Sequence, residues 1–393
     1  MVFGLVIAAF FPFLAIYLDA RGITAGQIGL VILVMALGRV IFLPLWGHVA
    51  DTTLGRVAVL RWGTLGTAGA AFAMNLVHGV VPIAAVAFVV SAFMVATGPN
   101  IDAIALKHLG EERMSDYGRI RGWESLSYAG GCLMFGALLQ AVGLRFAMPF
   151  FAVSSLSVLA WSWTLPADRP AAVTRHGKLG TVGAVFREAP RFWGFLAAVF
   201  LLWTGFNAAW NFFSLKIEHG GGGPLLVGIG TALGGVMEVP VMRLSSRLQR
   251  GWGLRRVYVL GCCVYALGFL SWGLFDSPTI VSMLTIFEGT AFGLIFTTSV
   301  VIIGRLVPES LYSTGNSMVA MVSFGIGPIL GAGVGGFVYQ YLGSTVLFSA
   351  AAALALAGAG VAWIALRTPQ LSGPSEDLSS VEPGLEPAPG IVP

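Results

Sequence analysis

Two stretches of this chain repeat one another, and both lie in strongly apolar sequence. Residues 36–40 read ALGRV and are followed by Pro44, while residues 232–236 read ALGGV and are followed by Pro240, an offset of 196 positions. Five further residues recur at an offset of 200 positions: Gly131, Gly136, Gln140, Gly143 and Trp163 return as Gly331, Gly336, Gln340, Gly343 and Trp363. Two like halves made of apolar helices are the plan of secondary transporters, whose halves move about a site between them.

The composition requires a lipid environment for most of the chain. Of its 393 residues, 56% are hydrophobic and 10% are charged, whereas soluble domains carry about 25% charged residues. At about 20 apolar residues per span, a dozen membrane-spanning helices fit and little remains for a soluble domain. The cysteines at 132, 262 and 263 lie in apolar runs and have neither a disulfide framework nor metal-ligand spacing.

Apolar runs bounded by charges or by glycine and proline predict twelve helices in two groups of six. The first group is expected near 2–19, 26–46, 57–76, 81–104, 120–142 and 147–165, and the second near 192–214, 225–243, 257–275, 279–302, 313–341 and 344–366. We therefore predict an all-α integral membrane protein with an N-terminal half (1–165), a basic linker (166–191), a C-terminal half (192–366) and a disordered tail (367–393). The first run has no charged lead or cleavage motif, so we expect a retained helix and no signal peptide.

The distribution of basic residues predicts the orientation in the membrane. With a cytoplasmic N-terminus, 18 of the 22 Lys and Arg residues fall on the cytoplasmic side. Arg21, Arg145 and Lys216 fall outside, and Arg39 lies within a span. Cytoplasmic loops of membrane proteins carry an excess of Lys and Arg, so both termini are expected in the cytoplasm.

Signatures of catalysis are missing from the sequence. It contains no Gly-x-Ser-x-Gly motif and no metal-ligand spacing, and the glycine run 220–223 is not followed by the Lys-Ser/Thr of a phosphate-binding loop. We therefore expect that the protein is neither an enzyme nor an ATP-driven pump. We also expect no cofactor, no bound metal and no nucleic-acid partner. An ion gradient is the expected energy source.

The loop after the second predicted span carries a recognisable motif. Residues 47–56 read GHVADTTLGR, and Gly47, Asp51, Gly55 and Arg56 resemble the G-x-x-x-D-[RK]-x-G-R-[RK] signature of the major facilitator superfamily. Thr52 replaces the usual base, and one residue is inserted before Gly55. The resemblance implies a loop that governs conformational switching, with Asp51 pairing with a base or a helix N-terminus in one state. The alternative is a charge that only anchors the helix end.

Four further segments are similar to the lactose-permease and phenylpropionate-permease branches of this superfamily. They are residues 10–13 (FFPF) with Tyr17-Leu18, residues 99–103 (PNIDA), residues 117–123 (YGRIRGW) and residues 287–289 (FEG). The resemblance covers nearly the whole chain and implies the twelve-helix major facilitator fold. It also implies a monomer in a bacterial inner membrane.

The fourth and fifth predicted spans carry candidate substrate residues. Arg121, Glu124 and Tyr128 share one helix face at i, i+3 and i+7, and Asp102 lies at a depth comparable with that of Arg121. In lactose permease an acid, an arginine and an aromatic residue at such positions hold the sugar, so the resemblance implies that Asp102, Arg121 and Tyr128 contact substrate. Alternatively, Asp102 and Arg121 form an ordinary ion pair at the membrane surface.

Glu288 lies near the middle of the tenth predicted span. Counting about eight residues from the outer helix end at about 1.5 Å each places it roughly 12 Å deep, too far for its short side chain to reach surface water. Ionisable side chains at such depths are functional candidates, and the resemblance to lactose permease implies a proton-carrying glutamate. The alternative is a buried, permanently hydrogen-bonded residue.

Other polar residues within the spans are candidates with two interpretations each. Glu238 beside Pro240, and Arg39 in the second span, would form a charge pair that acts as a gate or only as a structural link. Asn207 and Asn211 share a helix face at i, i+4, and they either line the substrate site or bond a neighbouring helix.

We expect a proton-coupled symporter of a small organic solute, such as an aromatic acid, a nucleoside or a sugar-like molecule. Glu288 and Glu238 would carry the proton. Thr285 stands where lactose permease has histidine, and 257–275 contains no arginine, so lactose itself is not the expected substrate. A proton-driven exporter, or a receptor or assembly factor that has lost transport, are the alternatives.

Overall fold

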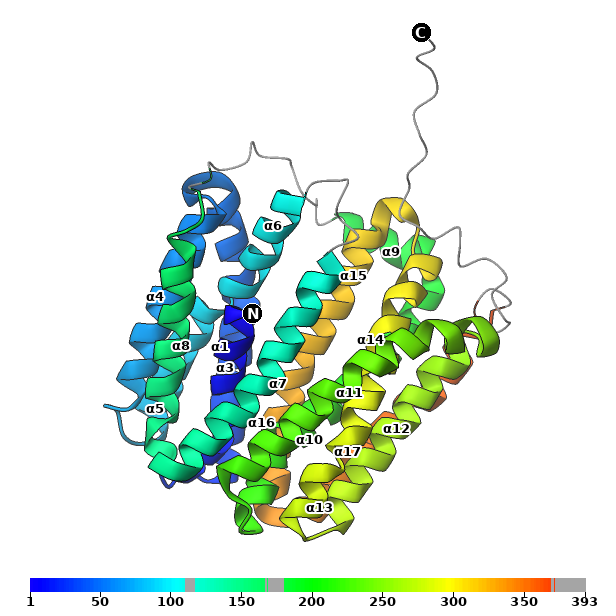
Figure 1. The fold of residues 1–393 in the computed structure, drawn as a ribbon. Coiled ribbons are helices and arrows are strands. Elements are labelled where there is room, and N and C mark those ends of the chain that lie inside the picture. Colours follow the sequence, from blue (N-terminus) through cyan, green and yellow to red (C-terminus); the bar gives the residue numbers. More distant parts are fainter. Residues whose placement is uncertain (110–116, 167, 169–179, 369–370, 372–393) are drawn as a thin grey trace.

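The structure is a computed structural model that describes residues 1–109, 117–166, 168, 180–368 and 371 (Figure 1). Every regular element in these residues is helical. Eleven helices among them are long and apolar enough to cross a membrane. The all-helical prediction is therefore confirmed, and the predicted tail at 372–393 lies outside the described residues.

The helices of the N-terminal half lie where the six spans were predicted, but the first and fourth predicted spans are each interrupted. These helices are α1 (Val2–Phe10), α2 (Leu14–Asp19), α3 (Ala25–Val49), α4 (Arg56–Met74), α5 (Val80–Met94), α6 (Thr97–Leu109), α7 (Tyr117–Val142) and α8 (Ala147–Ser162). Short elements join some of them: η1 (Ala50–Leu54) is a π-helix, and η3 (Leu144–Phe146) is a 3₁₀ turn.

The C-terminal half also consists of helices joined in places by short elements. Its helices are α10 (Pro190–His219), α11 (Gly223–Trp252), α12 (Leu254–Leu274), α13 (Pro278–Met283), α14 (Thr285–Leu306), α15 (Tyr312–Met321), α16 (Gly327–Leu342) and α17 (Ser344–Ala365). The 3₁₀ turn η4 (Glu309–Leu311) precedes α15, and the π-helix η5 (Val322–Ile326) separates α15 from α16. A further helix, α9 (Gly180–Glu188), lies within the segment predicted as a linker.

The first predicted span, 2–19, is interrupted in the structure. The α-helical hydrogen bonding stops after α1 and resumes at α2, with Phe13 N donating to Phe10 O at 3.2 Å between them. Pro12 causes the break, because its ring nitrogen has no hydrogen to donate and its ring crowds the preceding turn. Residues 2–19 therefore form two short helices and are not among the eleven long ones.

The sequence repeat is visible in the backbone. Gly143 and Gly343, 200 positions apart, precede the last helix of each half with φ values of 95° and 87°, which side chains with a Cβ rarely adopt. Pro44 and Pro240 each lie inside a long helix, α3 and α11. The two halves thus have a glycine with positive φ and a proline inside a long helix at matching positions.

Close glycine contacts bring the two halves together. A Cβ added to Gly29 of α3 would lie 3.1 Å from the Cα of Gly336 in α16, and one added to Gly136 of α7 would lie 3.2 Å from the Cα of Gly228 in α11. Small residues at such crossings let helix backbones approach in a membrane. The pairs α3–α16 and α7–α11 are therefore the places where the halves pack directly (Figure 1).

Candidate functional site

A buried carboxyl group lies where α11 and α14 cross. Glu288 lies in the first turn of α14, just after the short break that separates α13 from α14, and it is 4% exposed. A Cβ on Gly234 of α11 would lie 2.8 Å from Glu288 Oε2, and one on Gly289 would collide with Gly234 O. The two glycines thus allow the helices to close around this carboxyl. Among the described residues, no basic side chain forms an ion pair or hydrogen bond with it.

Three more side chains, from three helices, interact electrostatically with this carboxyl. Glu238, one turn beyond Gly234 on α11, is half-buried and interacts electrostatically with Glu288. Tyr128 of α7 and Tyr265 of α12 interact with both carboxyls. We call Glu238, Glu288, Tyr128 and Tyr265 the carboxyl cluster. It combines two acids and two phenols, and Tyr128 is its one member from the N-terminal half.

The carboxyl cluster contains one polar group that the protein leaves without a partner. Tyr265 is 2% exposed, and its hydroxyl has no hydrogen-bond partner among the described residues. Tyr128 is held against α11, since a Cβ on Gly235 would lie 3.6 Å from its ring. Sequence reasoning identified Glu238, Glu288 and Tyr128 but missed Tyr265, which lies in an apolar run with no local motif to mark it.

The other substrate candidates of the N-terminal half are less completely described. Asp102 lies on α6 and Glu124 on α7, and both side chains are half-buried. Arg121 lies in the second turn of α7, but its side chain is outside the described part of the structure. The structure therefore neither joins nor separates Asp102 and Arg121, and the assignment of these residues to substrate stays a prediction.

The two asparagines of α10 bond to backbone. Asn207 Nδ2 donates to Trp203 O at 2.7 Å and to Ser323 O of η5 at 3.4 Å. Asn211 Nδ2 donates to Asn207 O at 2.7 Å. Asn207 thus links α10 to the π-helix η5, as the interhelix interpretation of the sequence proposed, while both residues remain half-buried.

Arg39 has a different neighbour from the one the sequence suggested. Its Cζ lies over the ring of Phe11, 5.7 Å from the ring centre, at the break between α1 and α2. No ion pair joins Arg39 to Glu238 or to any other acid in the described part of the chain. The expected charge pair is thus not formed in this conformation.

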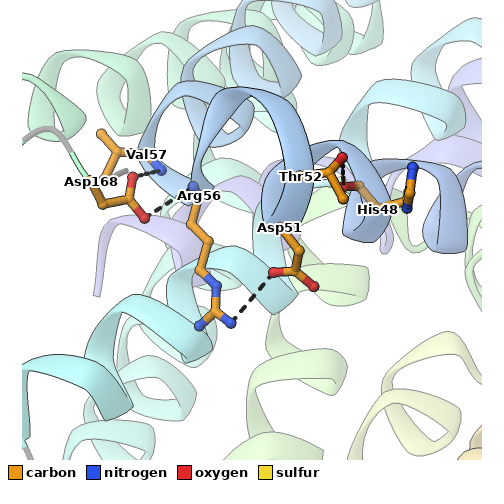
Figure 2. Close-up of polar contacts among 6 residues, drawn as sticks. All are labelled: His48, Asp51, Thr52, Arg56, Val57 and Asp168. Carbon is orange, nitrogen blue, oxygen red and sulfur yellow. Dashed lines mark hydrogen bonds and ion pairs between the residues drawn. The ribbon is translucent and has the colours of Figure 1, made fainter. Parts of the chain in front are cut away.

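The loop motif forms a compact polar turn (Figure 2). Arg56 Nη2 lies 3.6 Å from Asp51 Oδ1, and Gly55 between them has φ 79°. The π-helix η1 holds one residue more than an α-helical turn would, which accommodates the residue inserted before Gly55 relative to the signature. Its Thr52 hydroxyl donates to His48 O at 2.7 Å (Figure 2). Gly47, the first residue of the motif, is exposed near the end of α3.

A residue that sequence reasoning did not single out completes this turn. Asp168, which follows α8, accepts hydrogen bonds from Arg56 N at 3.1 Å and Val57 N at 3.0 Å (Figure 2). These are the free backbone amides at the start of α4, which an acidic side chain stabilises. Gly55, the N-cap residue, has no side chain to do so, and Asp168 lies 112 positions after Arg56. Only the fold brings this partner to α4.

Polar contacts join the two halves at the end of the bundle where α3 and α11 begin, opposite to α9 (Figure 1). Gln340 Oε1 accepts a hydrogen bond from Gly26 N at 2.9 Å, and Gln140 Oε1 accepts one from Leu225 N at 3.4 Å. His219 Nε2 lies 3.1 Å from Asp19 Oδ2. We call this the latch end, and its contacts hold the halves together in the present conformation.

Together, the paired halves, the glycine crossings and the acids buried between membrane helices define a membrane transporter of the major facilitator class. The sequence model of the "MFS_1 like family" matches residues 1–350 of the chain. The chain belongs to this family of transporters, which move small molecules across membranes and are not enzymes.

Known proteins resemble the chain over most of its length. The maltose permease of Geobacillus stearothermophilus is 28% identical over 349 residues, covering 86% of both chains. The probable 3-phenylpropionic acid transporter of Escherichia coli (strain K12) is 25% identical over 356 residues, covering 86% of this chain and 89% of the relative.

Solved structures support the same fold. The crystal structure of the nucleoside transporter NupG superposes with a TM-score of 0.81 at 17% identity, over 93% of this chain and 97% of NupG. A D-xylose-proton symporter gives a TM-score of 0.69 at 13% identity, over 92% and 94% of the two chains. The major facilitator fold predicted from the sequence is confirmed.

Proposed function

We propose that this transporter couples the movement of a small organic solute to that of a proton, by alternating access between its two halves. The observation that supports this most directly is Glu288, a carboxyl enclosed between α11 and α14 without a basic partner among the described residues. An ionised carboxylate is costly to bury without a partner, so the enclosed state suits a protonated Glu288. Opening of the α11–α14 contact to water would allow the proton to leave.

Glu238 is the proposed second proton site. It is more exposed than Glu288 and interacts with it electrostatically, so two negative charges there would repel each other. Ionisation of one acid therefore favours a proton on the other. A pair of acids that differ in exposure gives the proton a path from water to the enclosed site.

The proposed solute lies between the halves, near Tyr128. This ring belongs to α7 but packs on Gly235 of α11, so a solute that contacts it also contacts the carboxyl cluster. Asp102, Arg121, Glu124, Asn207 and Asn211 are the further proposed contacts. The relatives' names suggest three classes of solute: sugars, aromatic acids and nucleosides. Import is the proposed direction.

The proposed orientation follows from the basic residues. With both termini in the cytoplasm, the latch end faces the outside and the Asp51–Arg56 turn faces the cytoplasm. The conformation described here then has its halves joined on the outside. The relatives are bacterial, and we propose a monomer in a bacterial inner membrane. Breaking the Asp51–Arg56 contact and the Asp168 cap is the proposed cytoplasmic part of the switch.

The test is solute-induced proton uptake by proteoliposomes that contain the wild type, Glu288→Gln or Glu218→Gln. The control residue Glu218 is half-buried, less enclosed than Glu288, and lies at the latch end of α10. We expect one class of solute to alkalinise the bath with the wild type and Glu218→Gln, and not with Glu288→Gln. The mutant should still exchange labelled solute across the membrane, because only the proton step is lost.

Three other outcomes would each change the conclusion. Proton uptake that persists in Glu288→Gln and fails in Glu238→Gln would assign the proton to Glu238 alone. Proton release on solute efflux, with no uptake, would favour the exporter. A wild type that neither binds nor moves any solute in the panel would contradict transport and favour a receptor or assembly role.

A further inference from the structure

Arg39 is a cation in a membrane-spanning helix, and no described residue neutralises it. It lies fourteen residues after Ala25, the start of α3, which is about 21 Å along the helix axis. No hydrogen bond or ion pair joins its guanidinium to another described residue. Arginine inside a span is costly and is normally paired with an acid, a carbonyl group or water. Arg39 therefore has an unused capacity to bind an anion.

Its one described contact is aromatic. The guanidinium carbon lies 5.7 Å from the centre of the Phe11 ring, and the exposed fraction of Phe11 is 36%. Phe11 belongs to the break between α1 and α2, where Pro12 removes a backbone hydrogen bond. Broken helices in transporters commonly border the binding site. A cation and an exposed ring thus lie together at a feature typical of such sites.

The next residue on α3 places this region where the halves meet. A Cβ on Gly325 of η5 would lie 3.0 Å from Cγ2 of Val40, so α3 contacts the C-terminal half immediately after Arg39. The element contacted, η5, is a π-helix, and π-helices occur frequently at functional sites. A ligand on Arg39 would therefore be close to both halves.

Arg39 and the two acids of the carboxyl cluster belong to different halves. Arg39 belongs to the N-terminal half, whereas Glu238 and Glu288 belong to the C-terminal half and interact with each other and with tyrosines. A solute with a carboxylate would neutralise Arg39 without using either acid. Both acids would then remain available for the proton.

We propose that Arg39 binds the carboxylate of the transported solute and that Phe11 packs against its apolar part. The solute class is an organic monocarboxylate with an aromatic or similarly flat apolar body. The planar guanidinium can donate two parallel hydrogen bonds to a carboxylate, and the ring beneath it fixes the plane of approach. This inference rests on the proposed transport function and chooses among the solute classes named above.

The test compares two probes of nearly the same shape. 3-Phenylpropionate carries a carboxylate, whereas 3-phenylpropionamide is uncharged. Binding of each to the purified full-length protein in nanodiscs is measured by calorimetry. Hydrogen bonds to charged groups correspond to roughly 10- to 100-fold in affinity, so we expect the wild type to prefer the carboxylate by about 30-fold. Benzoate and cinnamate extend the panel of carboxylates, and maltose and uridine represent the uncharged classes.

Four variants separate binding from folding. Arg39→Gln should lose the preference for the carboxylate, and Arg39→Lys should keep part of it. Phe11→Leu should weaken the binding of both probes by the same factor. The control is Arg61→Gln, because Arg61 also lies over a ring, that of Trp163 at 4.5 Å, but donates to a backbone carbonyl. Arg61→Gln should leave the preference unchanged.

Three results of the binding measurements would overturn the inference. They are equal binding of amide and carboxylate by the wild type, no binding of any carboxylate in the panel, and an unchanged preference in Arg39→Gln. If Arg39→Gln fails to fold, the preference of the wild type for the carboxylate, and the part of it that Arg39→Lys keeps, still test the inference. Proton uptake driven only by maltose or uridine would overturn the inference and leave coupled transport standing. Carboxylate binding that depends on Arg39 but moves no protons would support the Arg39 inference and contradict proton-coupled transport.

Discussion

Gln140 and Gln340 lie 200 positions apart in the sequence and make equivalent contacts across the molecule. Each side-chain oxygen accepts a hydrogen bond from a backbone amide in the first turn of a helix in the other half, Leu225 N for Gln140 and Gly26 N for Gln340. The first amides of a helix have no partner within it. The repeated glutamines therefore supply these partners at the latch end, and they do so only while the halves are together.

Loss of both glutamines should favour the conformation that is open at the latch end. A hydrogen bond between neutral groups is worth about 1 kcal/mol, so Gln140→Leu with Gln340→Leu should shift the equilibrium by roughly 10- to 30-fold. Cys132 is buried on α7, and its backbone carbonyl lies against Gly228 of α11. Separation of α7 from α11 should therefore raise its rate of alkylation by a maleimide.

This measurement requires Cys262→Ser and Cys263→Ser, so that Cys132 is the one reactive thiol. The matched control is Gln249→Leu, because Gln249 is equally polar but bonds within its own half, to Ser245 and Thr298. It should leave alkylation of Cys132 unchanged. A double mutant that reacts no faster than the wild type would show that the glutamines do not hold the halves together.

The cap at the start of α4 should contribute to stability. Asp168→Ala removes the acceptor for two helix-terminal amides, and the loss of such a cap costs about 1 kcal/mol. We expect a lower midpoint of thermal unfolding in detergent and a smaller loss for Asp168→Asn, which keeps one acceptor oxygen. Asp276→Ala is the comparison, since it breaks an exposed pair with Lys216, and such pairs contribute little. Equal midpoints for Asp168→Ala and Asp276→Ala would contradict the capping role.

The crossing of α11 and α14 should not tolerate a methyl group at Gly289. A Cβ there would collide with the carbonyl oxygen of Gly234, so Gly289→Ala must separate the helices that enclose Glu288. Overpacking of this kind costs roughly 1–3 kcal/mol, and coupled proton uptake should fall with stability. The control is Gly69→Ala in α4, where nothing lies within 4 Å of the added Cβ. That change should be neutral or stabilise by up to about 1 kcal/mol, and similar behaviour of the two variants would refute the proposed close contact.

The architecture was predictable because its signals are local or periodic. Apolar runs gave the long helices, and the offsets of 196 and 200 residues gave the two matching halves. The break at Pro12 could also have been expected, since proline has no amide hydrogen. The inserted residue before Gly55 was noticed, but its outcome as the π-helix η1 requires the structure.

The contacts of the candidate site were less predictable, because they join distant residues. Asp168 follows α8 and reaches the start of α4 only through the packing of the N-terminal half, and nothing near it in the sequence marks it as a cap. Tyr265 is one of several aromatic residues in an apolar run. Its relation to Glu288 depends on how α12 packs against α14. The separation of Arg39 from Glu238 likewise depends on the conformation of the whole bundle.

The unpartnered hydroxyl of Tyr265 should oppose stability and support transport. Tyr265→Phe removes a buried polar group that lacks a hydrogen bond, and leaving such a group unpaired costs about 1–3 kcal/mol, so the variant should unfold at a higher temperature. It should also show weaker proton-coupled uptake, because the phenol interacts electrostatically with Glu288 and Glu238. Tyr258→Phe is the matched control: its hydroxyl is likewise buried and has no hydrogen-bond partner among the described residues, but it interacts electrostatically with Cys262 and Tyr265 and not with the two acids. It should gain stability with uptake unchanged. Full uptake in Tyr265→Phe would make this hydroxyl a packing defect with no part in transport, whereas a loss confined to Tyr265→Phe would place it in the path of the proton or solute.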